Sequence, residues 1–318
     1  LCMRIREKRE PISIILPVHN REELLPRAIN SVLDQTYANH ELIIVDDASP
    51  EDLESVVNSF KDSRIRYYRN EKNCGAVDVV DNWNKCLDYA QGDYIICMGD
   101  DDRLLPCCME EYAKLIDKYP NLGVYHAWTE LIDEDSKFLT LQQPRPEYET
   151  CRSLLWNRWH GRIQFIGDFC FEVRRLREDD GFYKIAMAWG SDDVSAVRAA
   201  RYGGISNTQK LCFQYRQNRY TITSTGDVFV KLDAIIKEKM WYGAFLAAYE
   251  NLIKEDIDMK CFSCIMSEMD QYYKTKLKNE MARDFAWHPM HVFKVLNSRK
   301  KYDVSAVRIL MALEKGIE

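Results

Sequence analysis

The sequence predicts an α/β fold with a mostly parallel sheet flanked by helices, followed by a C-terminal helical extension. Two patterns indicate this class. Short runs rich in β-branched residues alternate with amphipathic segments over roughly the first hundred residues, which is typical of strands and helices in βαβ order. Beyond residue 226 the apolar residues recur at helical spacing, and no strand pattern interrupts them.

The N-terminal elements follow from their own residues. The segment 11–20, PISIILPVHN, is a continuous apolar run that indicates a strand buried on both faces and ending at Pro17. Further strands are expected in 40–50, 64–70 and 93–102, and helices in 21–37, 51–62 and 74–92. The first of these helices is expected to bury one side, made of Leu24, Leu25, Ala28, Ile29, Val32 and Leu33.

The remainder of the chain is less regular before it becomes helical. A helix is expected at 107–119 and a strand pair near 122–135. The signals from 151 to 226 are mixed, with a second strand pair expected at 165–175. Helices are expected in 228–255, 260–285 and 305–315. We therefore expect a domain at 1–226, with halves at about 11–110 and 111–226, and a helical region at 227–318.

The composition limits which binding partners and which cellular compartment are expected for this protein. The net charge is −6, from 44 basic and 50 acidic residues, so no basic excess favours nucleic acid as a partner. The 11 cysteines have no repeated metal-ligand spacing, which favours free thiols in a reducing, cytoplasmic environment. The start of the chain is too charged for a secretory signal, and no apolar run is long enough to span a bilayer.

Polar residues follow three of the predicted strands. They are His19-Asn20-Arg21, Asp46-Asp47 and the acid triplet Asp100-Asp101-Asp102. Ligands of such sheets bind outside the carboxyl ends of the strands, so these groups are expected to meet in one cleft. Ordinary turn chemistry is the alternative for any single group. Three adjacent carboxylates are tolerable when Mn²⁺ or Mg²⁺ lies between them and also holds a diphosphate.

The segments ISIILPVHNREELLPRAINSVLDQTYANHELIIVDDAS, N-x-G and A-x-GDYIICMGDDD together resemble the inverting GT-A glycosyltransferases of family 2. The similarity is close over about 11–110. Beyond that it is limited to isolated matching residues, up to about 226. It implies a GT-A fold and metal-dependent transfer of a sugar from a nucleotide donor, with UDP the expected nucleotide. The acceptor would be a hydroxyl of a glycan or of a lipid-linked glycan.

The resemblance also assigns roles to single residues. Nucleotide-sugar contacts fall on Pro17, His19, Asn20, Asp46, Asp47, Asn73, Gly75, Asp100 and Asp101. Asp47 takes the position that binds the base. Asp100 and Asp102 are the expected ligands of Mn²⁺ or Mg²⁺, with Asp101 turned toward the ribose or the waters of the metal.

The general base is expected in MAWGSDDVSAVRAARYGG. Aligned with the family on Arg198, Asp192 takes the base position, and Asp193 is the second candidate. A base near the acceptor hydroxyl is what an inverting transfer requires. Gly190-Ser191 before the two acids also indicates a helix N-terminus, where acids are favoured without any catalytic role.

Three positions depart from the family pattern. Gly99 stands where relatives have Asp, Asp81 where many have Arg, and Asn218 where a metal-binding His often occurs. Arg216 and Arg219 are candidates to contact the diphosphate instead. These departures leave a degenerate sugar-nucleotide-binding protein without catalysis as an alternative.

Other classes fit less well. A nucleotidyltransferase usually has a Gly-rich basic loop after the first strand, and a response-receiver module has its acid pair there; LPVHNREELLP has neither. Lysines and aromatic residues on the C-terminal helices are compatible with peripheral contact at the inner face of a membrane, and they favour packing on the catalytic domain more strongly. The sequence does not disclose an oligomeric state.

Overall fold

The computed structural model describes residues 11–218, 227–250 and 256–317. The chain forms two compact units. The first comprises Leu1–Leu154, Arg162–Lys184 and Ser191–Arg219, and the second comprises Leu155–Gly161, Ile185–Gly190 and Tyr220–Glu318. The second unit therefore includes two short segments from the middle of the chain, which the helical periodicity did not indicate.

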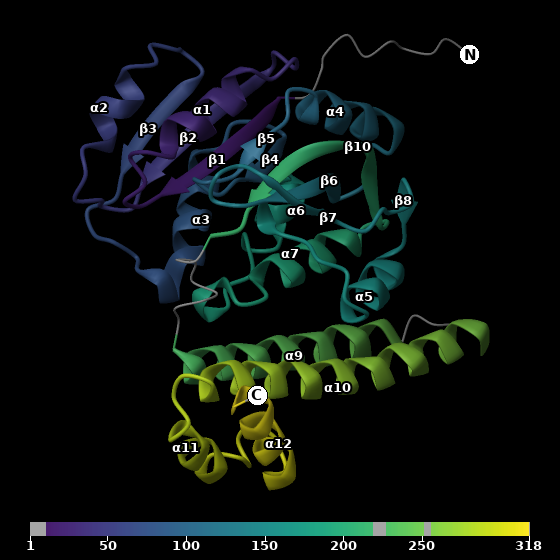
Figure 1. The fold of residues 1–318 in the computed structure, drawn as a ribbon. Helices are drawn as coiled ribbons and strands as arrows, with labels where there is room; N and C mark the ends of the chain where they lie inside the picture. The colour runs from purple at the N-terminus through teal and green to yellow at the C-terminus, as the bar shows by residue number, and fades with distance from the viewer. Residues whose placement is uncertain (1–10, 219–226, 251–255, 318) are drawn as a thin grey trace. The chain divides into compact units, whose positions relative to one another are not determined.

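The first four strands are parallel, in the order β3-β2-β1-β4. They are β1 (Ile12–Val18), β2 (His40–Asp46), β3 (Ile65–Arg69) and β4 (Tyr94–Cys97). Between them lie α1 (Leu25–Leu33), α2 (Leu53–Asn58), the short helix η1 (Ala76–Asp78) and α3 (Val79–Tyr89). The predicted alternation of strands and helices is confirmed for this half (Figure 1).

The sheet continues beyond β4 with mixed strand directions. In sheet order these strands are β9 (Phe169–Glu172), β6 (Val124–Ile132), β10 (Ile205–Arg216) and β5 (Arg103–Leu104). The strand β7 (Phe138–Leu141) pairs with β6, and β8 (Tyr148–Glu149) pairs with β10. Only β6 and β10 run parallel to each other in this half, so the α/β class is confirmed with a sheet that is mixed at one side.

Helices complete the first unit. They are α4 (Cys108–Lys118), α5 (Cys151–Trp159), α6 (Val173–Glu178) and α7 (Ser191–Ala200), with the short helix η2 (Ile166–Asp168) before β9. Only the beginning of α5, up to Leu154, belongs to the first unit. The segment 165–175, expected to be a strand pair, forms η2, β9 and the start of α6. That prediction was wrong because Val173 opens a helix rather than a second strand.

The core lies between the parallel strands and the helices that cover them. Ile12, Ile14 and Leu16 of β1 have no exposed surface, and neither do Leu42 and Ile44 of β2. The predicted apolar side of α1 packs on this layer, with Leu25, Ala28, Ile29 and Val32 buried. Both faces of β1 are buried, and the polar residues His19, Asn20 and Arg21 follow in the loop beyond its carboxyl end.

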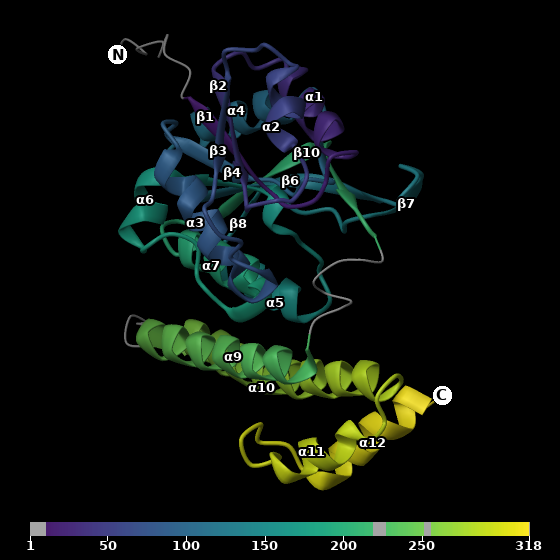
Figure 2. The same cartoon turned by 90° about the vertical axis from the view of Figure 1, so that its left-hand side faces the viewer.

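The second unit is helical in its described part (Figure 2). It contains α9 (Val228–Glu250), α10 (Asp256–Phe285), α11 (His291–Asn297) and α12 (Ala306–Ile317), with the short helix η3 (Ala186–Ala188). The helix α10 packs against both α9 and α12. Among the described residues no helix is both long enough and apolar enough to span a bilayer. The short helix α11 was not predicted from the sequence.

Candidate active site

The three polar strand ends meet at the carboxyl edge of the parallel strands. An imidazole nitrogen of His19, Nδ1, lies 3.1 Å from the carbonyl oxygen of Asp47. The backbone N–H of Asn20 donates to Oγ of Ser49 over 3.1 Å. The guanidinium of Arg21 lies 3.8 Å from a carboxylate oxygen of Asp100. Because β1 is the central strand of the three, its loop touches both neighbouring strand ends.

Asp46 is turned into the protein. Its carboxylate has no exposed surface and accepts hydrogen bonds from the backbone N–H of Ser49 at 2.8 Å and from the hydroxyl of Tyr67 at 2.9 Å, and it pairs with Arg69. Burial, together with the hydrogen bond to Asp46, raises the pKa of Tyr67 to about 12. Asp46 thus holds the turn after β2, and no face of it is open to a ligand.

Asp47 fixes the loop that follows β3. Its carboxylate accepts from the backbone N–H of Cys74 at 2.9 and 3.0 Å and from the side chain of Asn70 at 2.7 Å. On the same loop, the amide of Asn73 lies 2.9 Å from Nε2 of His19. Gly75, with φ of 74°, adopts the left-handed conformation that glycine tolerates best. Asn20, Asn73 and Gly75 are exposed, so this rim is accessible to a ligand.

The acid triplet lies mostly inside the protein. Burial, and secondly the charge of Asp101, raises the pKa of Asp100 to about 7. Burial also raises the pKa of Asp101, and it raises that of Asp102 well above its ordinary value, with the Asp101 carboxylate adding to the shift. The three carboxylates therefore lack enough positive charge nearby to stay ionised together.

The donor set of the triplet fits a hard divalent cation. It offers carboxylate oxygens only, which suits Mn²⁺ or Mg²⁺, and a cation would offset the cost of burying these charges. In the described part of the chain, the three acids do not bring one oxygen each within 4.8 Å of one another. This spacing suits two of the three as ligands better than all three.

The end of β10 holds the triplet in place. Asp102 accepts a hydrogen bond from the backbone N–H of Arg216, and Nε of Arg216 donates to the carbonyl oxygen of Asp101, both over 2.9 Å. The same guanidinium donates to the carbonyl oxygens of Asp133 and Glu134 at 2.8 and 3.1 Å. Arg216 is buried and serves protein carbonyls, so it is not the free diphosphate ligand expected as one alternative. Arg219 lies outside the described residues.

Gly99 provides the space for two of the acids. A Cβ at this position would lie 2.8 Å from Oδ2 of Asp102 and 3.2 Å from Oδ1 of Asp101, which is closer than real Cβ atoms normally approach. Asn218 donates from its amide to Asp101. Two of the departures from the family pattern, Gly99 and Asn218, therefore act together on the conformation of the same carboxylates.

The two candidate bases lie in the first turn of α7 and differ in environment. Asp193 is buried, and its Oδ1 accepts a 2.7 Å hydrogen bond from the side chain of Gln164. Asp192 is half-buried. Burial raises the pKa of Tyr215, and the charges of Asp102, Asp101 and Asp192 add to this rise. The charge of Asp192 thus acts on the same side chain as the charges of the triplet.

The segment before α7 is joined to α3 by hydrogen bonds and an ion pair. The side chain of Asn84 accepts from the backbone N–H of Phe182 at 2.7 Å and donates to its carbonyl oxygen at 3.1 Å. Gly181 has φ of +84°, and a Cβ there would lie 2.3 Å from Oδ1 of Asn84, so the turn requires glycine. Lys184 binds Asp81 of α3 at 2.6 Å. The acid that replaces Arg at position 81 therefore anchors the segment before α7.

A surface hollow of about 420 Å³ adjoins the triplet. It is lined by Asp133, Glu134, Asp135, Leu139, Gln217 and Asn218. Asn218 contacts both the hollow and Asp101, and Arg216 binds the backbone of its rim. Carboxylates and amides of this kind accept hydrogen bonds from sugar hydroxyls, so the hollow is chemically suited to a carbohydrate.

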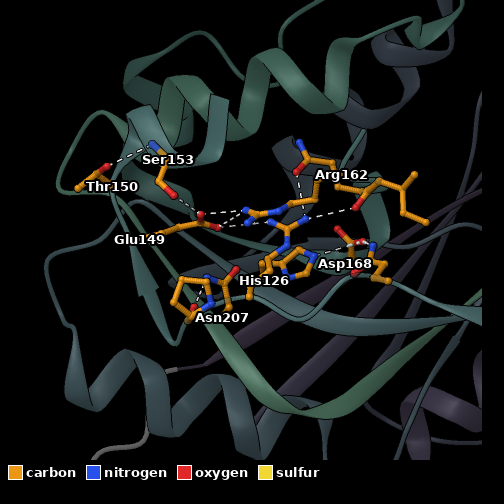
Figure 3. A network of polar contacts seen from close by, with 12 residues as sticks. His126, Glu149, Thr150, Ser153, Arg162, Asp168 and Asn207 are labelled. Atoms are coloured by element: carbon orange, nitrogen blue, oxygen red, sulfur yellow. Dashed lines mark hydrogen bonds and ion pairs between the residues drawn. The ribbon is translucent and has the colours of Figure 1, made fainter. Parts of the chain in front are cut away.

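A buried polar network lies next to α7 within the first unit (Figure 3). Glu149 binds Arg162 at 2.7 and 2.9 Å and accepts from Ser153 at 2.8 Å. Gln164 accepts from Arg145 at 3.1 Å and donates to Asp193, so the network extends to α7. Sequence reasoning missed Gln164 and Tyr215, because no motif marks either residue.

Asp168 and His126 belong to this buried region. Both are almost completely buried, and their side chains lie 3.5 Å apart. Burial raises the pKa of Asp168 to about 7 and lowers that of His126 well below its usual range. Among the described residues, neither ring nitrogen of His126 has a hydrogen-bond partner. The depth of both residues supports a structural role rather than contact with an acceptor.

The mixed sheet and its flanking helices form a fold of the GT-A type. Residues 13–176, just over half of the chain, match the family model described as Glycosyl transferase family 2. The chain belongs to this family, as the motif resemblance indicated, and members of the family generally use a divalent metal.

Similar proteins support the same assignment. The chain is 46% identical over 97 residues to the putative colanic acid biosynthesis glycosyl transferase WcaA of Escherichia coli K12, covering 30% of this chain and 34% of WcaA. It is 29% identical over 220 residues to an E. coli UDP-Glc:alpha-D-GlcNAc-diphosphoundecaprenol beta-1,3-glucosyltransferase, WfgD, covering 67% and 79%. The crystal structure of S. aureus TarS 1–349 with UDP-GlcNAc shares the fold, with a TM-score of 0.61, 15% identity and coverage of 92% and 78%.

Proposed function

We propose that this protein is an inverting glycosyltransferase that moves a sugar from a UDP-sugar to a hydroxyl of a lipid-linked glycan. One observation carries the proposal most directly. Asp192 in the first turn of α7 and the acid triplet after β4 lie in the same compact unit, and the charges of both act on Tyr215. A base beside a diphosphate site is the arrangement that a single-displacement transfer requires.

In this mechanism, Asp192 accepts the proton of the attacking hydroxyl as the new glycosidic bond forms. The nucleoside diphosphate departs on the opposite face of the sugar, so the anomeric configuration inverts. A divalent ion held by Asp100 and Asp102 would act as a Lewis acid on the departing diphosphate. Asp193 keeps α7 in position through Gln164, which is why we assign the base to Asp192.

The rim around His19 is the proposed nucleotide site. Asn20, Asn73 and Gly75 are exposed there, and Asp47 holds the 70–75 loop in place through Cys74. Pro17 lies one residue before the end of the strand that carries this rim. We assign contact with the nucleotide to His19, Asn73 and Gly75, and assign the support of their loops to Asp46 and Asp47.

The donor and acceptor follow by analogy with named proteins. WfgD is named for UDP-Glc and for a GlcNAc-diphosphoundecaprenol acceptor, and the TarS crystal contains UDP-GlcNAc. The shared family and fold support UDP as the nucleotide and a diphosphate-linked lipid glycan as the acceptor. The acidic hollow beside Asn218 is the proposed place for polar groups of the sugar substrates.

Peripheral membrane contact fits such an acceptor. Trp287, Met290 and Phe293 in the second unit are 82%, 70% and 58% exposed, and Lys294 follows directly in the chain. Aromatic side chains beside lysine favour the interface of an anionic bilayer. We therefore propose that the protein acts at the cytoplasmic face of a membrane, with a catalytic domain at 1–226 and a helical region at 227–318 that touches lipid.

The test is a transfer assay on the full chain. The protein is incubated with Mn²⁺, UDP-glucose or UDP-GlcNAc, and a lipid diphosphate that bears GlcNAc. The proposal predicts a product heavier by one sugar with inverted anomeric configuration by NMR, and no product with Asp192→Asn. Nucleotide binding without transfer to this or to other glycan acceptors would instead favour the degenerate, non-catalytic relative.

A further inference from the structure

The corner between α10 and α11 brings together one carboxylate and two imidazoles that the proposed transfer does not use. Asp284 lies in the last turn of α10, His288 in the connecting turn, and His291 at the first position of α11. Each offers one ligand atom, and these atoms all lie within 4.8 Å of one another. In the described part of the chain, no other group of three acidic, histidine or cysteine residues meets this condition.

The separations between the three side chains match those of ligands around a metal ion. Nδ1 of His291 lies 2.9 Å from Oδ2 of Asp284, and Nδ1 of His288 lies 3.3 Å from Oδ1. Bonds of about 2.0–2.2 Å to Zn²⁺ place neighbouring ligand atoms roughly 3.0–3.5 Å apart. Small side-chain rotations from this arrangement would therefore be enough to bind an ion.

The backbone of the corner fixes the three ligands before any ion arrives. The N–H groups of Trp287 and His288 donate to the carbonyl oxygen of Asp284 at 3.0 and 2.8 Å, and the N–H of His291 donates to the carbonyl oxygen of His288 at 2.9 Å. Pro289 limits the freedom of the turn further. The conformational entropy of this turn, whose loss usually opposes metal binding, is therefore already lost when the protein folds.

Exposure leaves room for the remaining ligands of an ion. The side chain of Asp284 is 11% exposed, that of His291 27% and that of His288 62%. The carboxylate thus lies at the base of the group, while the outer imidazole faces solvent. Water or one further ligand can complete a four-coordinate shell from the open side.

We propose that Asp284, His288 and His291 form a Zn²⁺ site that clamps the end of α10 to the start of α11. Two imidazoles and one carboxylate are borderline donors that suit Zn²⁺, whereas Mg²⁺ and Mn²⁺ prefer oxygen ligands. The acid triplet of the first unit offers oxygen only, so the two sites select different ions. The zinc site does not depend on the proposed transferase activity.

An ion pair between Asp284 and protonated imidazoles is the competing explanation of the same distances. The ring centroids of His288 and His291 are 5.1 Å apart in nearly parallel planes, with an angle of 19°. Two imidazolium charges at that distance repel each other, and a single carboxylate neutralises only one of them. Imidazole binds a metal ion through the lone pair of a ring nitrogen, so bound Zn²⁺ and this ion pair exclude each other.

A zinc titration of the chelator-stripped full chain tests the proposal. Zn²⁺ is added in competition with a chromophoric chelator, and the thermal midpoint is measured with and without the ion. The proposal predicts one tight equivalent of Zn²⁺ and a raised midpoint, both resistant to excess Mg²⁺. Affinity falls by at least about 10–100-fold in His288→Ala and in Asp284→Asn, because each loses a ligand.

Matched variants separate this site from other zinc-binding groups. His160 is another surface histidine of the second unit, 3.5 Å from Glu268, and His160→Ala should bind Zn²⁺ like the wild type. Asp102→Asn should also keep the tight equivalent. Wild-type affinity in His288→Ala, a variant that removes a mostly exposed ring, would overturn the proposal. So would the absence of any tight equivalent in the wild type.

Discussion

The backbone N–H of Arg216 donates a 2.9 Å hydrogen bond to Oδ1 of Asp102, and this bond joins residues that are 114 positions apart. The side chain of Arg216 binds carbonyl oxygens of Asp101, Asp133 and Glu134. The last long strand of the first unit therefore fixes the conformation of the acid triplet. The position of these carboxylates depends on the sheet being complete, and the triplet is not a solvated turn.

Replacing Arg216 by Lys should loosen this end of the sheet. A lysine keeps the charge but cannot donate to three separate carbonyl oxygens in a fork. We expect a loss of about 1–3 kcal/mol in the free energy of unfolding, measured by chemical denaturation. Arg174→Lys, at an exposed pair with Glu178, is the matched control and should change stability by less than about 0.5 kcal/mol.

Restoring the commoner family residue at position 99 should impair the site rather than improve it. A Cβ on Gly99 would lie 2.8 Å from the carboxylate of Asp102, so either the side chain or the backbone must move. We expect Gly99→Ala and Gly99→Asp to weaken Mn²⁺-dependent nucleotide binding by about tenfold or more, measured by calorimetry. Unchanged or tighter binding in Gly99→Asp would show that the triplet tolerates this crowding.

Substitutions of the two acids of α7, Asp192 and Asp193, should have different effects on kinetics and on stability. Asp192→Asn removes the proposed base and should lower kcat by about 10²–10⁴-fold with little change in the melting temperature. Asp193→Asn alters a buried hydrogen bond to Gln164 and should mainly lower the melting temperature. Steady-state kinetics and thermal unfolding of both variants check this assignment. The reverse pattern would make Asp193 the base.

The stability of the first unit should fall as the pH rises from about 4 to 7, in part because of Asp168. Burial raises its pKa from the ordinary 3.8 to about 7, so in this window the folded protein holds a proton that the unfolded chain has released. The slope due to one such group approaches about 1.4 kcal/mol per pH unit and vanishes above pH 7.

The comparison with Asp168→Asn isolates this contribution. The variant cannot release the proton, so the difference in unfolding free energy between wild type and variant should shrink as the pH rises through this window. Urea denaturation at intervals of half a pH unit measures it. A difference that stays constant with pH would mean that Asp168 is ionised in the folded protein throughout.

Predictions from the sequence were most successful where the structure depends on local residue patterns or on the direction of neighbouring strands. The apolar run of β1 predicted a doubly buried strand, and the polar ends of β1, β2 and β4 do meet, because parallel neighbours bring their carboxyl ends to one edge. Helix α7 begins at Ser191 as its Gly-Ser-Asp-Asp start indicated. These features depend on neighbours in the chain or on the direction of strands.

Features that depend on distant partners could not be predicted. Nothing near Asp46 indicates that Tyr67 and Arg69 enclose it, while Asn73 remains exposed. The strand pair expected at 165–175 was wrong, because a strand and a short helix can have the same apolar residues. Asp193 is buried and accepts a hydrogen bond from Gln164, which no motif marks.

Calorimetric titration of UDP, GDP, CDP and TDP, each with and without Mn²⁺, into wild type and Asp102→Asn tests the central claim most directly. The variant keeps an oxygen to accept from the N–H of Arg216 but loses the charge. The account predicts that UDP binds the wild type only with Mn²⁺, and that the variant has no such binding although it is folded. Equal binding to both proteins, or no metal-dependent binding of any nucleotide to the wild type, would contradict a diphosphate site built on the acid triplet.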